Sequence, residues 1–202
     1  MGAKSWQLGS PGTLTYRLYD ALRNQLNGKL VNYLLARAIN HDKCKVLEAG
    51  SGPAFASSML AQDPRVEFSV AIDLDIEALY EARRRDSALC LVVADLCNLP
   101  FRAETMNLSW NSSTIEHLPD PSCAVAEMAR VTRNGGSVFV GVPNLYGPLG
   151  FEYLIRETSI GIWIGQTFTG AGLREMLINS GLKPQHSLFY FFRFFVGVLA
   201  QK

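Results

Sequence analysis

Four short apolar runs, each ending in a polar residue or a glycine turn, follow one another along this chain with room for helices between them. They occupy residues 46–54, 71–73, 92–95 and 108–111. Strands that alternate with helices pair in parallel, through right-handed crossovers. The carboxyl ends of parallel strands meet at one edge of the sheet, where such folds bind their ligands. The four polar ends therefore predict one binding pocket.

Helical periodicity, capping residues and prolines predict the remaining elements. Leucines at close to helical spacing indicate one long or two shorter helices over 13–39. Asp75 and Asp120 are expected N-caps, the second followed by Pro121 at the first helical position. The helix that starts at Asp120 is expected to run to about Val131, and the glycine pair 135–136 is expected to end it. Further strands are expected at 45–49, 66–72, 89–94, 106–110 and 137–142, helices at 53–62, 75–85 and 169–180, and a closing antiparallel hairpin at 185–190 and 194–200.

Composition favours a single packed domain and gives no sign of a polyanionic partner. The 202 residues are 48% apolar and 18% charged, with a formal net charge of +1. A net charge near zero provides no global field for nucleic acid or an anionic membrane. The longest apolar run, 188–200, contains Arg193 and is too short to span a bilayer. No basic-then-apolar leader opens the sequence, so a cytoplasmic location is expected.

The cysteines do not form a recognisable framework. Cys44, Cys90, Cys97 and Cys123 include no CxxC pair and have no histidine at ligand spacing. Scattered cysteines beside apolar strands are more often small core residues than disulfides or metal ligands. They predict free thiols in a reducing compartment and no metal site.

The glycine-rich turn after the first strand differs from a dinucleotide fingerprint. In G-x-G-x-x-G the third glycine permits close packing of helix and strand, and here Phe55 takes that position. Glu48 lies two residues before the first glycine, Gly50. A carboxylate there would repel a pyrophosphate and attract an amino group or a sulfonium. The charge pattern therefore favours a cationic cofactor.

From 45 to 144 the chain resembles the class I S-adenosylmethionine-dependent methyltransferases, the seven-stranded Rossmann-like kind. Residues 48–54 are similar to that family's acidic-x-G-x-G-x-G first motif, with Ala54 where a third glycine is usual. Residues 115–121 and 134–136 look like the small-molecule branch, which includes quinone-biosynthesis enzymes. The resemblance implies an α/β fold, a mostly parallel seven-stranded sheet with helices on both faces and a C-terminal antiparallel hairpin.

The same resemblance implies S-adenosylmethionine as cofactor, with S-adenosylhomocysteine as product, and assigns roles at the strand ends. Asp73 would hold the ribose hydroxyls, Asp95 the adenine amino group, and Asn111 would lie beside the methionine moiety. Cofactor contacts are expected at Glu48, Gly50, Gly52, Asp73, Leu74, Asp95, Leu96 and Asn111. Other readings stay open: a helix-capping Glu48, core leucines, a turn asparagine at Asn111. The catalytic residue is not identified; His117 is a candidate base, although that motif is mainly structural in the family.

One domain over 1–202 is expected, with four parts. Residues 1–40 form a helical cap, 45–144 the cofactor-binding core, 145–168 a lid, and 169–202 the closing helix and hairpin. The 145–168 segment, which includes Trp163, carries many aromatic and aliphatic residues between glycines. It suits a lid over a small apolar or aromatic acceptor. Core or a dimer surface is the alternative for this segment, so a homodimer stays open.

The expected activity is methyl transfer from S-adenosylmethionine by in-line displacement. A non-catalytic protein of the same fold, acting as a binding or scaffolding subunit, is the main alternative. A nucleotide-dependent oxidoreductase is less favoured because of Phe55. Nucleic acid is not an expected acceptor, since the fourth strand runs into Asn111, Ser112 and Ser113 and lacks the Asn/Asp-Pro-Pro-aromatic motif used on base amino groups.

Overall fold

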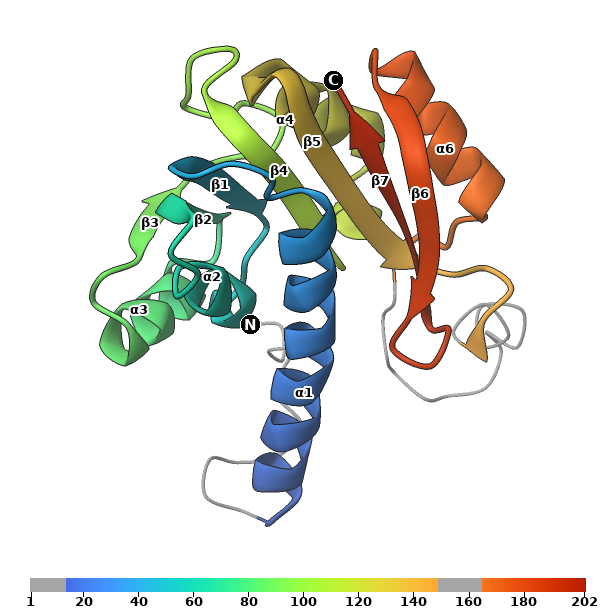
Figure 1. The fold of residues 1–202 in the computed structure, drawn as a ribbon. Coiled ribbons are helices and arrows are strands. Elements are labelled where there is room, and N and C mark those ends of the chain that lie inside the picture. The colour runs from blue at the N-terminus through green and yellow to red at the C-terminus, as the bar shows by residue number, and fades with distance from the viewer. Residues whose placement is uncertain (1–13, 149–164) are drawn as a thin grey trace.

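The computed structural model describes residues 14–148 and 165–202, and these form a seven-stranded sheet between two layers of helices (Figure 1). The strand order is β3-β2-β1-β4-β5-β7-β6. The strands are β1 (Cys44–Ala49), β2 (Val66–Asp73), β3 (Cys90–Val93), β4 (Met106–Ser112), β5 (Thr132–Pro143), β6 (Lys183–Tyr190) and β7 (Phe195–Gln201). The helices are α1 (Leu14–Arg37), α2 (Phe55–Leu60), α3 (Ile76–Arg85), η1 (Ile115–His117), α4 (Pro121–Val131) and α6 (Gly170–Asn179).

The sheet is parallel from β3 to β5, and in the closing hairpin only β7 runs against the other strands. β1 pairs in parallel with β2 on one side and with β4 on the other. β7 pairs antiparallel with both β5 and β6. The chain therefore builds outward from β1 to β3, returns to β4, and leaves a switch point between β1 and β4, where this kind of fold binds ligands. The predicted fold class is confirmed.

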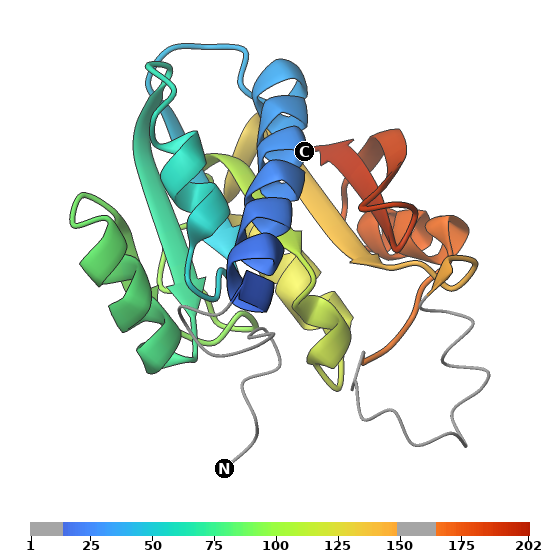
Figure 2. The same ribbon diagram turned by 90° about the horizontal axis from the view of Figure 1, so that it is seen from below.

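Helices cover both faces of the sheet (Figures 1 and 2). On one face, Leu34 of α1 and Leu60 of α2 belong to one buried cluster with Val46, Leu108 and Phe139 of the strands. The alternate strand residues point to the other face, where they meet α4 and α6. Within the described residues, no helix is long and apolar enough to cross a membrane.

The predicted N-caps are confirmed. The Asp75 carboxylate accepts hydrogen bonds from the backbone N–H groups of Glu77 and Ala78, and the Asp120 carboxylate accepts one from Ser122. One uninterrupted helix, α1, covers the first leucine-rich segment.

The predicted end of the fourth helix near Val131 is confirmed, but the prediction that the glycine pair 135–136 ends it is wrong. The helix ends at Val131, and β5 begins at Thr132. The Thr132 hydroxyl donates to the carbonyl oxygen of Met128 and so satisfies one of the last helical acceptors. Both glycines lie inside β5, near a register shift against β4. A β-branched residue with a local hydrogen bond thus ends the helix before the glycines are reached.

The prediction that all four cysteines are unpaired is also wrong. Cys97 and Cys123 form a disulfide with their Cα atoms 5.0 Å apart, whereas Cys44 and Cys90 are free. The fold brings together a loop after β3 and the first turn of α4, which are 26 residues apart in sequence. The cysteine pattern therefore no longer supports a reducing compartment, and the cytoplasmic location stays a prediction.

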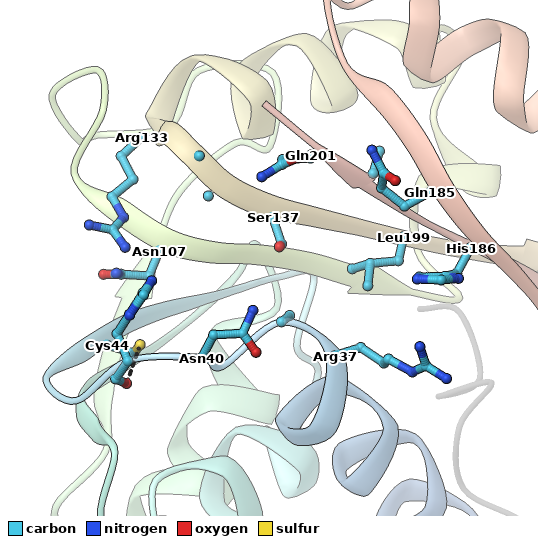
Figure 3. A pocket seen from close by; sticks show the side chains of 15 residues that line it. Arg37, Asn40, Cys44, Asn107, Arg133, Ser137, Gln185, His186, Leu199 and Gln201 are labelled. Atoms are coloured by element: carbon cyan, nitrogen blue, oxygen red, sulfur yellow. Dashed lines mark hydrogen bonds between the residues drawn. The ribbon is translucent and has the colours of Figure 1, made fainter.

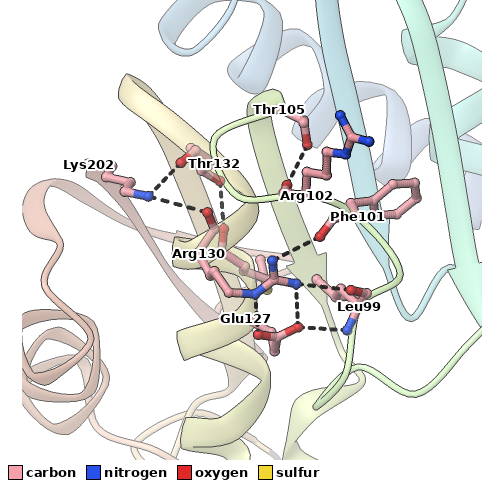
Figure 4. Close-up of polar contacts among 9 residues, drawn as sticks. Leu99, Phe101, Arg102, Thr105, Glu127, Arg130, Thr132 and Lys202 are labelled. Atoms are coloured by element: carbon pink, nitrogen blue, oxygen red, sulfur yellow. Dashed lines mark hydrogen bonds and ion pairs between the residues drawn. The ribbon is translucent and has the colours of Figure 1, made fainter.

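A polar network fastens the loop between β3 and β4 to α4 (Figure 4). Arg130 donates to the carbonyl oxygens of Phe101 and Leu99, at 2.8 and 3.0 Å. Glu127 accepts from the Leu99 backbone N–H at 2.7 Å and pairs with Arg130. At the far end Lys202 donates to the Thr132 carbonyl oxygen at 2.8 Å. The chain after Asp95 is thereby held against the helical layer.

Most of the predicted lid, including Trp163, lies outside the described residues. Its flanks are described: Asn144 forms a parallel bridge with Phe168, and its backbone N–H donates to the Phe194 carbonyl oxygen. The division of the chain into cap, core, lid and closing part stays a prediction.

Candidate active site

The glycine-rich turn joins β1 to α2 and is tied to the end of β2. Gly50 and Gly52 have φ angles of +79° and +50°, which residues with a side chain rarely adopt. The backbone N–H groups of Gly50 and Ser51 both donate to the Ile72 carbonyl oxygen. The Gly52 N–H donates to the Asp73 Oδ2 at 2.6 Å. These hydrogen bonds hold the glycine-rich turn in one conformation around the Asp73 carboxylate.

Asp73 is the last residue of β2, and its carboxylate can accept further hydrogen bonds from a ligand. Its Oδ1 accepts from the Asp75 N–H at 2.9 Å, and its Oδ2 accepts from Gly52. Each carboxylate oxygen has about two acceptor positions, so one on each stays available. The residue is half-buried at the strand end, where two neighbouring hydroxyls of a ribose would fit the donor requirement. Asp75, by contrast, is occupied in capping α3.

The two leucines expected to wall the adenine differ in their exposure to solvent. Leu74 is 63% exposed, whereas Leu96 is 5% exposed and belongs to the core cluster. Asp95 is exposed, and its Oδ1 accepts from the Cys97 N–H at 2.9 Å. Because β3 pairs with β2 through Val93 and Asp73, Asp95 follows on the same edge of the sheet. An apolar ring would therefore cover Leu74 more than Leu96.

Asn111 closes the site from β4. It is fully buried, and its Nδ2 donates to the Ala49 carbonyl oxygen at the end of β1. Its Oδ1 is buried with no hydrogen-bond partner among the described residues. Such an orphaned acceptor is costly unless a donor reaches it. The amino group of an amino-acid moiety is a donor of the required kind, so these residues fit S-adenosylmethionine.

Glu48 has the geometry of the capping alternative. It is 7% exposed, and its Oε2 accepts from the Ser57 N–H at 3.0 Å and from the Ser57 hydroxyl. Burial raises the pKa of the carboxyl to about 8, against the lowering effect of the Ser57 bonds. A carboxyl held this way is largely protonated at neutral pH. The predicted contact between Glu48 and the cofactor stays a prediction.

Glu48 makes stability depend on pH. With its pKa raised from an ordinary 4.5 to about 8, the folded state keeps a proton that the unfolded chain has released. Its stabilising contribution is thus complete below pH 4.5 and is lost as pH rises toward 8. The wild type should therefore lose roughly 3 kcal/mol of unfolding free energy between pH 5 and 8 that Glu48→Gln, which cannot titrate, does not lose. Chemical denaturation at both pH values measures this.

Glu77→Gln is the control for that measurement, since Glu77 is exposed on α3. Its stability relative to the wild type should be unchanged between the two pH values. A parallel response of Glu77→Gln and Glu48→Gln would contradict the assignment to Glu48.

Sequence reasoning missed a buried polar group below the β4 end. Glu116 is 1% exposed, its Oε2 has no hydrogen-bond partner among the described residues, and burial raises its pKa to about 7. The His117 Nε2 lies 4.0 Å from the Glu116 Oε1, and burial lowers the pKa of the imidazole. The glutamate beside the candidate histidine was the available signal. Burial thus favours the uncharged form of both groups.

Tyr190 was missed as well, because only the hairpin brings it to this edge. Its hydroxyl lies 2.8 Å from the Ser112 Oγ at the end of β4. Burial raises the pKa of the phenol. A Cβ on Gly141 would lie 1.9 Å from the Tyr190 hydroxyl, so the absence of a side chain in β5 makes this contact possible.

Comparison with known proteins agrees with this geometry. Residues 47–140 match the family described as Methyltransferase domain. The chain is 31% identical over 125 residues to the malonyl-[acyl-carrier protein] O-methyltransferase of Erwinia billingiae. The matched region covers 61% of this chain and 47% of that protein. It is 34% identical over 138 residues to a "Probable S-adenosylmethionine-dependent methyltransferase" of Mycobacterium tuberculosis, covering 67% of this chain and 47% of that protein. The chain thus spans about half the length of these curated relatives.

Solved structures share the fold at low sequence identity. Magnesium protoporphyrin IX methyltransferase from Synechocystis, solved with S-adenosylhomocysteine, has a TM-score of 0.76 at 16% identity, covering 98% of this chain and 91% of that chain. Geranyl diphosphate methyltransferase, in complex with S-adenosylmethionine, has a TM-score of 0.70 at 18% identity, covering 96% and 93%. With the match to the Methyltransferase domain family over residues 47–140, the relatives named S-adenosylmethionine-dependent methyltransferases and the fold shared with these solved structures, the chain belongs to the class I S-adenosylmethionine-dependent methyltransferases.

Proposed function

We propose that this protein transfers the methyl group of S-adenosylmethionine to a small, largely apolar or aromatic acceptor. The observation that carries the cofactor assignment is Asp73, held between Gly52 and Asp75 with acceptor capacity left on both oxygens. The exposed Leu74 beside it offers apolar surface to a ring. A polar and an apolar contact for the cofactor thus lie side by side at the carboxyl edge of the sheet, at the end of β2.

The residues of this edge would divide the cofactor among them. Asp73 accepts from the ribose hydroxyls, Asp95 from the adenine amino group, and the Asn111 Oδ1 from the amino group of the methionine part. When bound, the sulfonium supplies an electrophilic methyl group. The protein's own contribution is to hold donor and acceptor in line and to exclude water.

A proton acceptor is needed when the acceptor atom carries a proton. Glu116 is the group whose burial and orphaned oxygen suit this role, because its raised pKa of about 7 allows both protonation states at neutral pH. His117 is the second candidate, since burial lowers the pKa of the imidazole and so favours its uncharged form. A carbon nucleophile of an enol or phenol would need neither.

The apolar character of the acceptor is inferred from the sequence between β5 and α6. The segment 145–168 is rich in aromatic and aliphatic residues, and the described Tyr146 is 83% exposed. A highly charged acceptor would leave such side chains without a role. One relative is named a malonyl-[acyl-carrier protein] O-methyltransferase, so a carboxyl oxygen is a further acceptor atom to be tested. We propose no nucleic-acid acceptor and a cytoplasmic location.

Methyl transfer is tested with S-adenosylmethionine labelled in the methyl group. The purified chain is incubated with phenolic and quinol acceptors, with malonyl-[acyl-carrier protein], and with RNA and DNA. We expect label in a small apolar acceptor, and its loss in Glu116→Gln if the acceptor atom is oxygen or nitrogen. Cofactor binding without transfer to any acceptor would instead support a non-catalytic binding or scaffolding subunit. Transfer to nucleic acid alone would contradict the acceptor class.

A further inference from the structure

The edge of the sheet opposite the candidate active site holds a cavity of about 190 Å³ (Figure 3). Its wall combines the end of α1 and the following loop with the first residues of β1, β4 and β5. The hairpin completes the wall with Gln185, His186, Leu199 and Gln201. Because β7 is antiparallel, its last residues lie at the same edge as the first residues of β5. The cavity is therefore separate from the carboxyl-edge site.

The lining is cationic and amide-rich, with no carboxylate. Two guanidinium groups, Arg37 and Arg133, and two imidazoles, His41 and His186, contribute to it. Asn40, Asn107, Gln185 and Gln201 add side-chain amides. Among the described residues, no carboxylate forms an ion pair with either arginine. Unlike a solvated basic helix face, these groups come from segments far apart in sequence.

Two donors of the lining, from Arg133 and Asn107, have no acceptor among the described residues. The Nε of Arg133 is buried and has no hydrogen-bond partner among the described residues. The Asn107 Oδ1 already accepts from the Lys45 N–H at 3.0 Å, so its amide nitrogen is the group left to donate. Figure 3 shows Arg133 and Asn107 next to each other on one side of the cavity. A buried donor without a partner, such as the Arg133 Nε, is costly unless an acceptor binds it.

We propose that this cavity binds the phosphate group of a small molecule. A phosphate offers several acceptor oxygens and a charge that matches both guanidinium groups, for which charge-assisted hydrogen bonds are strong. The volume is below the range of typical drug-sized pockets, so the occupant is small. The near-zero net charge of the chain provides no global field toward a nucleic-acid backbone.

The experiment titrates inorganic phosphate and glycerol 3-phosphate into the purified chain at constant ionic strength, by calorimetry and thermal shift. The wild type should bind both saturably. Arg133→Gln and Arg37→Gln should each weaken binding by roughly ten-fold or more, as expected for the loss of a charged donor. Arg84→Gln is the matched control, because Arg84 is exposed at the end of α3, away from the cavity. It should bind phosphate like the wild type.

Circular dichroism and S-adenosylhomocysteine titration accompany every variant, so that misfolding and failure of the active site are seen separately from loss of phosphate binding. If Arg133→Gln does not fold, Arg37→Gln decides the question. No saturable binding of either phosphate compound, or equal loss in Arg84→Gln, would overturn the proposal. Preferential binding of a single-stranded oligonucleotide, reduced by the same cavity variants, would overturn it in favour of a nucleic-acid contact.

Discussion

Gly50→Ala should lower the free energy of unfolding by about 4 kcal/mol and abolish measurable cofactor binding. Gly50 has a φ of +79°, and a Cβ there would lie 2.3 Å from the Thr114 Cγ2. The substitution combines backbone strain with an overpacked contact, and the turn that positions Gly52 against Asp73 must shift. Chemical denaturation and S-adenosylhomocysteine titration measure the two effects.

Gly52→Ala separates strain from overpacking. Gly52 also has a positive φ, of +50°, but a Cβ there would meet nothing within 4 Å. Its stability loss should be about 1 kcal/mol, the cost of the backbone conformation alone. Adding Thr114→Gly to Gly50→Ala removes all three Thr114 side-chain atoms that the new Cβ would meet and should restore part of the lost stability. Equal losses in Gly50→Ala and Gly52→Ala, or no recovery in the double variant, would refute the steric account.

Asp73→Ala should weaken S-adenosylhomocysteine binding by roughly ten- to a hundred-fold, because hydrogen bonds to a charged acceptor contribute on the order of 1.5–3 kcal/mol. The carboxylate also accepts from two backbone N–H groups, of Gly52 and Asp75. Asp73→Asn retains one acceptor oxygen for these groups and should lose less stability than Asp73→Ala. Isothermal titration gives the affinities and denaturation the stabilities.

Asp75→Ala is the matched control two residues away. Asp75 caps α3 through Glu77 and Ala78, so its loss should lower stability by about 1 kcal/mol and leave affinity nearly unchanged. Equal affinity losses at Asp73 and Asp75 would contradict this division between ribose binding and helix capping.

The order of strands and helices was predictable because its signals are local. Apolar runs, the Asp75 and Asp120 caps and the helical leucine spacing each act within a few residues, and all agree with the structure. The glycine pair 135–136 misled because a nearer local contact, the Thr132 hydroxyl on the Met128 carbonyl oxygen, ends the helix first. Two local rules competed there, and their relative strength is not visible in the sequence.

Contacts between distant segments were not predictable in the same way. Tyr190 reaches Ser112 only through the pairing of β7 with both β5 and β6, and Cys97 meets Cys123 only after the loop closes on α4. The Glu48 carboxyl was expected to face a cationic cofactor, yet Ser57 of the following helix holds it. Sequence placed these residues at an edge, whereas the direction of each side chain depends on tertiary packing.

Calorimetric titration with S-adenosylhomocysteine and, separately, with NADH tests the cofactor assignment most directly. A ligand that binds only the folded state raises stability, by about 2.7 kcal/mol at a hundred times its Kd. We expect saturable binding of S-adenosylhomocysteine with a matching rise in Tm, strongly reduced in Asp73→Ala, and no response to NADH. A Tm shift with NADH and none with saturating S-adenosylhomocysteine would contradict the methyltransferase assignment.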